Sequence, residues 1–230
     1  FMQEMRTQTA SMKPDFWLMG EVIHGEYGRW VNDGMLHSVT NYELHKSLYS
    51  GLNDHNFFEI AHNVRRLEAI GTRLYTFLDN HDENRIASKL NKKAHLPLAW
   101  TLLFTLPGIP SIYYGGEWGL EGMRTRESDT ALRPCITLKE GEAKHSDLTD
   151  LIAKLARTEN PEFHGGRYQE LLLTNRQYAF ARHAQGSICI TAANSDDQES
   201  RLSIPVPLHA SQAENLMDGS IIPVENGTLN

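Results

Sequence analysis

The sequence has few cysteines, no excess of basic residues and no long apolar run, and each absence argues against a class of protein. Only Cys135 and Cys189 are present, far apart, so the sequence suggests neither a disulfide framework nor a zinc site. Acidic residues outnumber basic ones, 29 to 22, which argues against nucleic acid or an anionic membrane as the main partner. No apolar run approaches the length of a membrane span. The histidines show no compact ligand spacing, and we expect no metal site.

The remaining composition is that of a globular protein. Hydrophobic residues make up 40% of the 230, enough for a core in one large domain or two modest ones. The first residue is Phe1 rather than Met, and residues 1–15 read as the middle of a helix. We therefore expect the chain to come from a longer protein, and its localisation is left open.

Residues 1–160 alternate between apolar strand patterns and helical patterns. Turn-forming residues and spacing predict helix caps at Asn53 or Asp54, at Gly71 and at Ser146. The alternation predicts a parallel sheet covered by helices. The expected strands are residues 15–22, 38–42, 73–79 and 111–115, and the expected helices are residues 43–52, 55–70, 94–108 and 146–160.

After Pro161 the pattern changes to short runs of β-favouring residues separated by turn formers. The expected strands are residues 168–174, 177–183, 187–194 and 201–206. Such spacing predicts an antiparallel sheet or sandwich. We place a domain boundary near Asn160–Gly166, which gives an α/β domain at 1–160 and an all-β domain at 161–230.

Two acids lie where apolar runs stop, Glu21 in "FWLMGEV" and Asp82 in "LYTFLDNHD". Acids at strand ends lie at the mouth of a fold, and paired carboxylates are what glycoside hydrolysis needs. Taken singly, Glu21 fits a solvated loop acid, and the Asp82 segment fits a polar turn that caps the next helix. Trp30 and Trp118 fit either sugar stacking or burial. The repetition at successive strand ends favours the functional interpretation.

These segments resemble the α-amylase superfamily. "MGEVIHGEYGRW" is similar to its acid/base segment, "FLDNHDENR" to its His-Asp segment and "GIPSIYYGGEWGLEG" to its last barrel strand. "DTALRP" resembles the stretch that follows, and "NPEFHGGRYQELLLTNRQYAFAR" resembles the start of its C-terminal β domain. The resemblance implies the second half, strands five to eight, of a (β/α)₈ TIM barrel, followed by an antiparallel, sandwich-like β domain.

The resemblance also implies roles for individual residues. Glu21 corresponds to the general acid/base, and Asp82 to the carboxylate that binds two sugar hydroxyls and stabilises the transition state. His81 is implied as a neighbouring hydroxyl ligand. Asp129 and Arg133 are implied to line a donor subsite, and His24 resembles the cyclomaltodextrinase and neopullulanase branch, which has an aromatic residue where this chain has Ile23.

Some parts of the family pattern have no counterpart here. The nucleophilic Asp, with an Arg two residues earlier, is missing, and so are the third-strand segment and the inserted calcium-binding domain. We therefore expect no cofactor in this chain, with any calcium confined to the missing part. The chain alone is expected to be inactive and to need the missing barrel half or self-association, because its outer strands lack neighbours.

The implied activity is cleavage of α-1,4-glucosidic bonds, with retention, in starch-like glucans, maltooligosaccharides or cyclodextrins. A transferase of the same family, a phosphorylase or glucanotransferase, is one rival, because the half in view does not decide whether water or a sugar attacks. A non-catalytic binding or assembly subunit is the other. The presence of Glu21 and Asp82 argues against that second rival for the whole protein.

Overall fold

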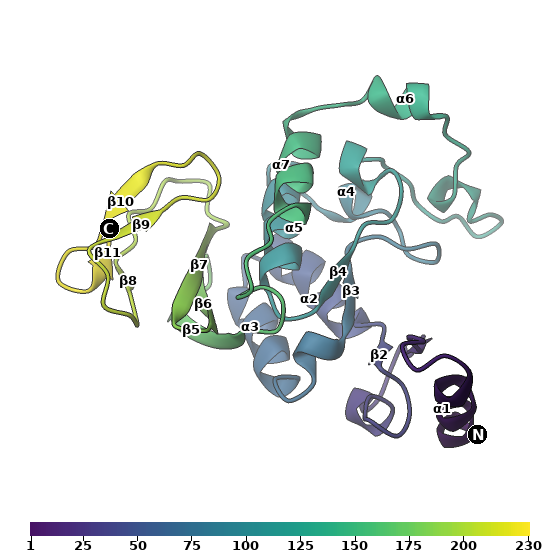
Figure 1. The fold of residues 1–230 in the computed structure, drawn as a ribbon. Helices are drawn as coiled ribbons and strands as arrows, with labels where there is room; N and C mark the ends of the chain where they lie inside the picture. Colours follow the sequence, from purple (N-terminus) through teal and green to yellow (C-terminus); the bar gives the residue numbers. More distant parts are fainter.

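The computed structural model describes all 230 residues, and four short parallel strands form the centre of their first 160. The strands lie side by side in chain order, because an isolated parallel bridge between Thr40 and Tyr75 joins the first pair to the second. Figure 1 shows the second pair in the middle of the helices. The four strands are β1 (Met19–Gly20), β2 (Ser38–Val39), β3 (Tyr75–Phe77) and β4 (Ile109–Ser111).

α-Helices connect the second strand to the third and the third to the fourth, as expected of parallel pairing, whereas only a short 3₁₀ helix lies between the first two. The α-helices are α1 (Met2–Met12), α2 (Tyr42–Asn53), α3 (Phe57–Arg66), α4 (Ile86–Lys89), α5 (His95–Thr105), α6 (Leu138–Glu142) and α7 (Asp147–Ala156). Short 3₁₀ helices are η1 (Tyr27–Arg29), η2 (Gly71–Arg73), η3 (Gly116–Trp118) and η4 (Thr130–Leu132). None of these helices combines the length and apolar character that crossing a lipid bilayer requires.

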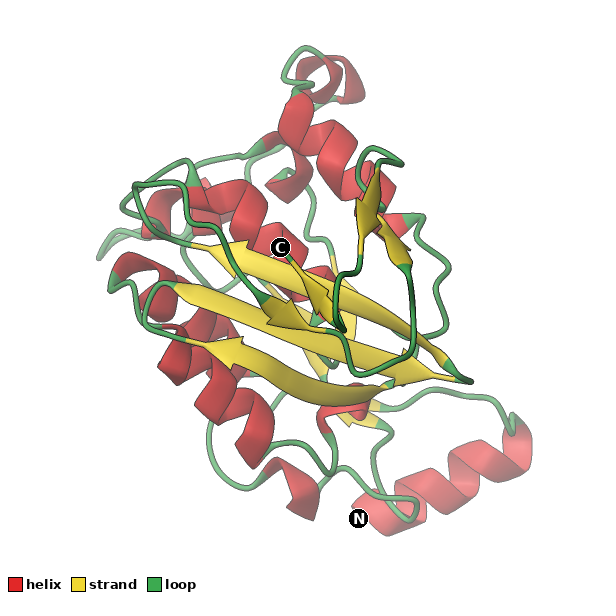
Figure 2. Ribbon diagram, turned by 90° about the vertical axis from the view of Figure 1, so that its left-hand side faces the viewer, coloured by secondary structure: helices red, strands yellow, loops and turns green.

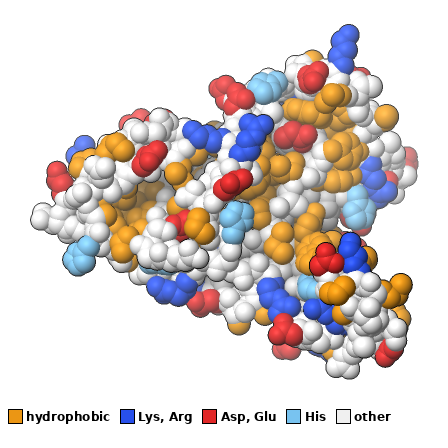
Figure 3. Space-filling view, in the orientation of Figure 1, with side chains coloured by type: hydrophobic (Ala, Val, Ile, Leu, Met, Phe, Trp, Pro, Cys, Tyr) orange, Lys and Arg blue, Asp and Glu red, His pale blue; other side chains and the backbone are white.

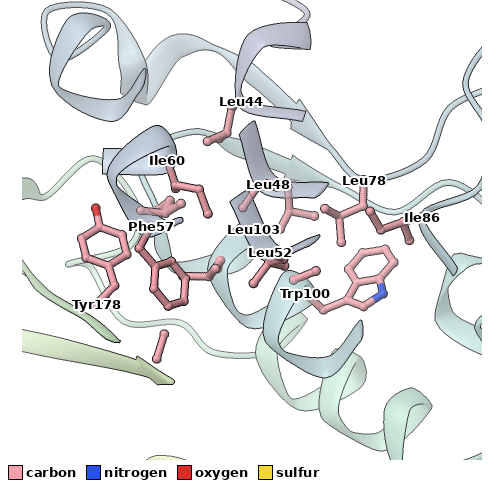
Figure 4. Close-up of a cluster of buried hydrophobic side chains, with 14 of the residues drawn as sticks. Leu44, Leu48, Leu52, Phe57, Ile60, Leu78, Ile86, Trp100, Leu103 and Tyr178 are labelled. Carbon is pink, nitrogen blue, oxygen red and sulfur yellow. The ribbon is translucent and has the colours of Figure 1, made fainter. Parts of the chain in front are cut away.

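The main hydrophobic core lies between α2, α3 and α5 (Figure 4). Leu44, Leu48 and Leu52 recur at the spacing of one helix face on α2 and are fully or almost fully buried. Trp100 and Leu103 of α5 face them. Full burial of each such side chain stabilises the fold by roughly 1.5–3 kcal/mol, so the strands are fixed mainly by the helices that pack on them.

The last third of the chain is antiparallel. A three-stranded sheet in the order β5-β6-β7 is visible in Figure 2, beside two two-stranded sheets. The predicted strands 168–174, 177–183 and 187–194 are confirmed. The strands are β5 (Arg167–Leu173), β6 (Gln177–Ala184), β7 (Ser187–Asn194), β8 (Ile204–Pro205), β9 (Gln212–Glu214), β10 (Ile221–Pro223) and β11 (Thr228–Leu229). The sandwich-like arrangement and the domain division at 160/161 stay predictions.

The antiparallel sheet packs directly on the helices. Tyr178 of β6 is fully buried against Phe57 of α3, with ring centroids 5.7 Å apart. Arg182, also fully buried, donates to the carbonyl oxygens of Gly166 at 3.1 Å and Thr105 at 3.0 Å. The guanidinium thus satisfies a carbonyl in the last turn of α5, where a helix leaves its carbonyls free.

Several predicted boundaries are wrong. The run at 15–22 pairs only at Met19–Gly20, and the strand predicted at 38–42 ends at Val39. The strand predicted at 111–115 lies at Ile109–Ser111 instead. Pro110 is tolerated within it because β4 has a neighbouring strand on one side only. The strand predicted at 201–206 is reduced to Ile204–Pro205.

The predicted caps of the helix at 55–70 are also wrong. Asn56, rather than Asn53 or Asp54, precedes α3, and the helix ends at Arg66 instead of reaching Gly71. Gly71 begins η2, since its backbone does not adopt the left-handed conformation that favours glycine at a helix end. Ser146 is confirmed as the residue that caps α7, with Thr149 Oγ1 accepting from its backbone N–H at 3.2 Å.

Candidate active site

Glu21 follows β1 directly and emerges at the carboxyl end of that strand. Gly20 before it lies so close to Leu36 that an added Cβ would come within 2.5 Å of Leu36 Cδ1. The Val22 N–H then donates to Thr40 Oγ1 at 3.0 Å, which ties the chain after Glu21 to the end of β2. The Glu21 side chain is exposed, and Tyr42 Oη donates to its Oε1 at 2.8 Å. Glu21 is therefore accessible, with one oxygen already bonded.

Asp82 lies in the loop that joins β3 to α4, and two side chains of the loop shape it. Asn80 Oδ1 accepts from the backbone N–H groups of Asp82 at 3.0 Å and Glu83 at 2.8 Å, a turn typical of asparagine. Buried Asp79 accepts from the Ile86 N–H at 2.5 Å and so joins the loop to the start of α4. Burial raises the pKa of Asp79 to about 6. The loop therefore presents His81 and Asp82 on a fixed turn.

Glu21, His81 and Asp82 come together although β1 and β3 are separated by β2 in the sheet. Each offers one oxygen or nitrogen, and these three atoms all lie within 4.8 Å of one another. His81 Nε2 lies 3.1 Å from Asp82 Oδ2. The spacing also suits a metal ion, and no other cluster of carboxylates and imidazoles in the chain is so compact. The absence of a metal from the proposed chemistry stays a prediction.

Arg133 brings the loop after β4 to the same place. Its Nε donates to the His81 carbonyl at 2.9 Å, and its Nη2 donates to Asp82 Oδ1 at 3.2 Å. The same Nη2 forms an ion pair with Asp129. The two oxygens of Asp82 therefore contact different neighbours, Oδ1 the guanidinium and Oδ2 the imidazole of His81. Such polar contacts are the kind that sugar hydroxyls can join or replace.

His24 is the predicted site residue that the structure does not bring into this cluster. Its side chain is exposed and forms no hydrogen bond or ion pair, and Gly25 after it turns the chain with a positive φ of 102°. Its implied role stays a prediction.

The aromatic residues near the site are mainly packed. A Cβ added to Gly141 would lie 2.1 Å from the Trp118 ring, so this ring is covered by α6. Trp30 packs against the smaller core beneath β1 and β2. Fully buried Arg85 lies 4.5 Å from the Tyr113 ring centroid and donates to the Tyr114 carbonyl at 2.7 Å. Burial rather than sugar stacking is supported for Trp118.

Sequence reasoning missed Tyr42 and Asn80 as site residues. Tyr42 was expected in a strand, whereas it is the first residue of α2, with Asn41 capping that helix by accepting from the Leu44 N–H at 2.9 Å. The available signal was the position of Asn41–Tyr42 after a strand, where Glu21 and the Asp82 loop also follow theirs. Burial, followed by the hydrogen bond to Glu21, raises the pKa of Tyr42 above its ordinary value, so its hydroxyl keeps its proton.

Comparison with known proteins now identifies the family. The model of the α-amylase catalytic domain matches residues 1–161, and the chain belongs to that family. It is 28% identical over 210 residues to the cyclomaltodextrinase of Thermoanaerobacter pseudethanolicus, covering 86% of this chain and 36% of that protein. It is also 28% identical over 244 residues to a cyclomaltodextrin glucanotransferase of Bacillus sp. (strain 1-1), covering 98% of this chain and 34% of that protein.

Solved structures show the same fold. An Anoxybacillus α-amylase aligns with 99% of this chain and 52% of its own, at 24% identity and a TM-score of 0.85. A Nostoc punctiforme debranching enzyme aligns with 99% of this chain and 53% of its own, at 23% identity and a TM-score of 0.80. The chain thus spans about a third of the length of the curated relatives and about half of the solved chains.

Proposed function

We propose that residues 1–230 supply the acid/base and one further carboxylate of an enzyme that cleaves α-1,4-glucosidic bonds with retention. Its substrates are starch-like glucans, maltooligosaccharides or cyclodextrins. The observation that supports this most is the convergence of Glu21, His81 and Asp82, within 4.8 Å, at the carboxyl ends of parallel strands. The names of the curated relatives support the substrate class.

In this proposal the four parallel strands are strands five to eight of a (β/α)₈ barrel, followed by a C-terminal all-β domain. The nucleophile lies in sequence outside residues 1–230. It attacks the anomeric carbon while Glu21 gives its proton to the leaving oxygen, and the carboxylate of Glu21 then takes a proton from the incoming water. Asp82 and His81 bind hydroxyls of the sugar whose ring flattens and gains positive charge. Asp129 and Arg133 line the adjacent donor subsite, and His24 contacts a neighbouring sugar of the substrate.

Transfer to a sugar acceptor is the second candidate. It is favoured by one observation, that a relative named cyclomaltodextrin glucanotransferase aligns with 98% of the chain. Both reactions share the first half, up to the glycosyl-enzyme, and differ in whether water or a sugar hydroxyl attacks it. Residues Glu21 and Asp82 serve both.

The test uses the full-length product of the gene, incubated with soluble starch, maltooligosaccharides and cyclodextrins. Release of reducing ends with the α-anomer appearing first in proton NMR is the expected result. Longer oligosaccharides formed from a single starting chain length would indicate transfer. Residues 1–230 produced alone are expected to release none, because they carry no nucleophile. An inactive full-length protein that still bound maltooligosaccharides would favour the binding subunit instead.

A further inference from the structure

A continuous chain of hydrogen bonds runs from the Asp82 loop to Glu21 through Asn80 and Tyr42. Asn80 Nδ2 donates to Tyr42 Oη at 2.8 Å, and Tyr42 Oη donates to Glu21 Oε1 at 2.8 Å. The two residues come from different elements, the loop after β3 and the first turn of α2.

The donors in this chain are fixed by the surrounding groups. Asn80 Oδ1 accepts from two backbone N–H groups, of Asp82 and Glu83, so the other end of its amide is the NH₂. Since that NH₂ donates to Tyr42 Oη, the hydroxyl proton of Tyr42 is left to point at Glu21 Oε1. An oxygen that accepts this hydrogen bond is not the one that carries the acidic proton.

We infer that Tyr42, held by Asn80, is a positioning residue that directs the acidic proton of Glu21 to Oε2. This inference rests on the proposed function. When the Oε2 proton moves to the glycosidic oxygen, that oxygen leaves with the electron pair of its bond to the anomeric carbon. Glu21 becomes a carboxylate, and the Tyr42 hydroxyl stabilises the new charge through a hydrogen bond that strengthens as the charge forms.

The environment of Tyr42 keeps this geometry in place. The Tyr42 side chain is only 8% exposed, and its ring packs edge-on against Phe77 of β3, with centroids 5.0 Å apart. The titratable groups of His81 and Asp82 lie close to the Glu21 carboxyl, beside the Tyr42 hydroxyl that bonds to it. Two further charged groups act through these neighbours. Glu83 acts electrostatically on the Tyr42 hydroxyl, and Arg133 donates a hydrogen bond to Asp82.

The experiment compares Tyr42→Phe with the parental full-length protein on two substrates. A maltooligosaccharide needs its leaving oxygen protonated, whereas α-maltosyl fluoride releases fluoride with little help from an acid. We expect kcat/KM on the maltooligosaccharide to fall about 10–100-fold, a part of what a positioned acid contributes. Turnover of the fluoride should change less than threefold. Loss of a donor to the carboxylate should also move the basic limb of the pH profile up by about 0.5–1 pH unit.

Two further variants sharpen the test. Asn80→Asp keeps the oxygen that shapes the loop but removes the NH₂ donor. Like Tyr42→Phe, it should lower kcat/KM on the maltooligosaccharide far more than turnover of the fluoride. Tyr49→Phe removes a hydroxyl on the same helix that has no hydrogen bond, and it should leave both rates unchanged. Equal losses on both substrates in Tyr42→Phe, or an unshifted pH profile, would overturn the inference while leaving the proposed function intact. A parental protein that turned over neither substrate would overturn both.

Discussion

Lys89 of α4 and Glu83 of the Asp82 loop form an ion pair, with Nζ 2.5 Å from Oε2, at a place where both side chains are largely shielded. Fully buried His45 of α2 lies against them, its Nε2 2.9 Å from Lys89 Nζ and 3.8 Å from Glu83 Oε2. The imidazole also stacks on Phe77 of β3 at 4.9 Å. The loop with the two site residues is thus tied to α2, β3 and α4 on the side of Glu83.

Lys89→Met is expected to destabilise the protein by about 1–3 kcal/mol, because Glu83 would keep a partly buried charge without its cation. Chemical unfolding of the full-length protein at neutral pH measures this. The matched control is Lys93→Met, because Lys93 is 82% exposed in its pair with Glu121. Its substitution should lower the free energy of unfolding by less than about 1 kcal/mol. Equal effects of the two substitutions would contradict the structural role of the Lys89 pair.

Acid should weaken this network. The nearby imidazole of His45, together with the hydrogen bond that Lys89 donates, lowers the pKa of Glu83 to about 2 from its ordinary value of 4.5. A lowered folded-state pKa contributes stability that is present above pH 4.5 and is lost as the pH falls towards 2. The free energy of unfolding should therefore fall less between pH 5 and pH 2 in Glu83→Gln than in the parent. The same dependence on pH in both proteins would show that the lowered pKa of Glu83 does not stabilise the fold.

For Asp79 we expect the opposite dependence of stability on pH, at a higher pH. Its pKa is raised from 3.8 to about 6 by burial, so the folded state binds the proton more tightly than the unfolded state. The resulting stability is fully present below pH 3.8 and is lost as the pH rises through 6, by at most about 3 kcal/mol. Asp79→Asn keeps an oxygen for the Ile86 N–H and should remove this fall between pH 4 and 7. A parental slope in the variant would show that Asp79 is not the group that titrates.

The sequence predicts the helices and strands that bury many side chains far better than it predicts where they end. The runs of α2, α5, β6 and β7 are recognisable because burial imposes a period on their apolar residues. The start of α2 depends on one side-chain bond, from the Leu44 N–H to Asn41, and a strand pattern at 38–42 concealed it. The position of β4 depends on pairing with Tyr75–Phe77, which no local pattern reveals.

The same limit applies to the site. Glu21 and Asp82 could be found because two acids at the ends of apolar runs together suit glycoside hydrolysis, although each alone has an ordinary explanation. Tyr42 and Lys89 could not, because a Tyr or a Lys at a helix end has many ordinary roles. Their partners, Glu21 and Glu83, are reached only through the three-dimensional fold.

Glu21→Gln and Asp82→Asn should each abolish most turnover in the full-length protein. A positioned acid/base contributes roughly 10²–10⁴-fold, and under the proposed function the hydrogen bonds that Asp82 accepts from sugar hydroxyls tighten as the sugar becomes cationic. Steady-state kinetics on a maltooligosaccharide should show the loss in kcat, with binding retained. Glu26→Gln is the control, since Glu26 is exposed in the same loop as Glu21 and its carboxylate has no partner. Near-parental rates in either variant would show that the assigned role is wrong.

Arg133→Lys should raise KM for maltooligosaccharides about tenfold, with a smaller change in kcat. One lysine ammonium cannot reproduce the separate bonds from the guanidinium to the His81 carbonyl and to Asp82. A change in KM alone indicates binding that is equal in ground and transition states. Arg126→Lys, in the same loop but exposed and without a bonded partner, should have no effect. A fall in kcat without a change in KM would move Arg133 from substrate binding to the chemical step.

Residues 1–230 produced alone are expected to self-associate. β1 pairs only with β2 and β4 only with β3, so each has one free edge, and free strand edges pair with other chains. Large hydrophobic side chains are exposed beside these edges, including Trp17, Met19 and Ile112, and Figure 3 shows exposed hydrophobic patches among charged residues on one face. Light scattering after gel filtration should give a mass above 26.1 kDa. Met19→Lys places a charge on one edge and should reduce the association. A folded, active monomer of the unmodified chain would refute the expected association, and it would also show that no nucleophile from outside residues 1–230 is needed.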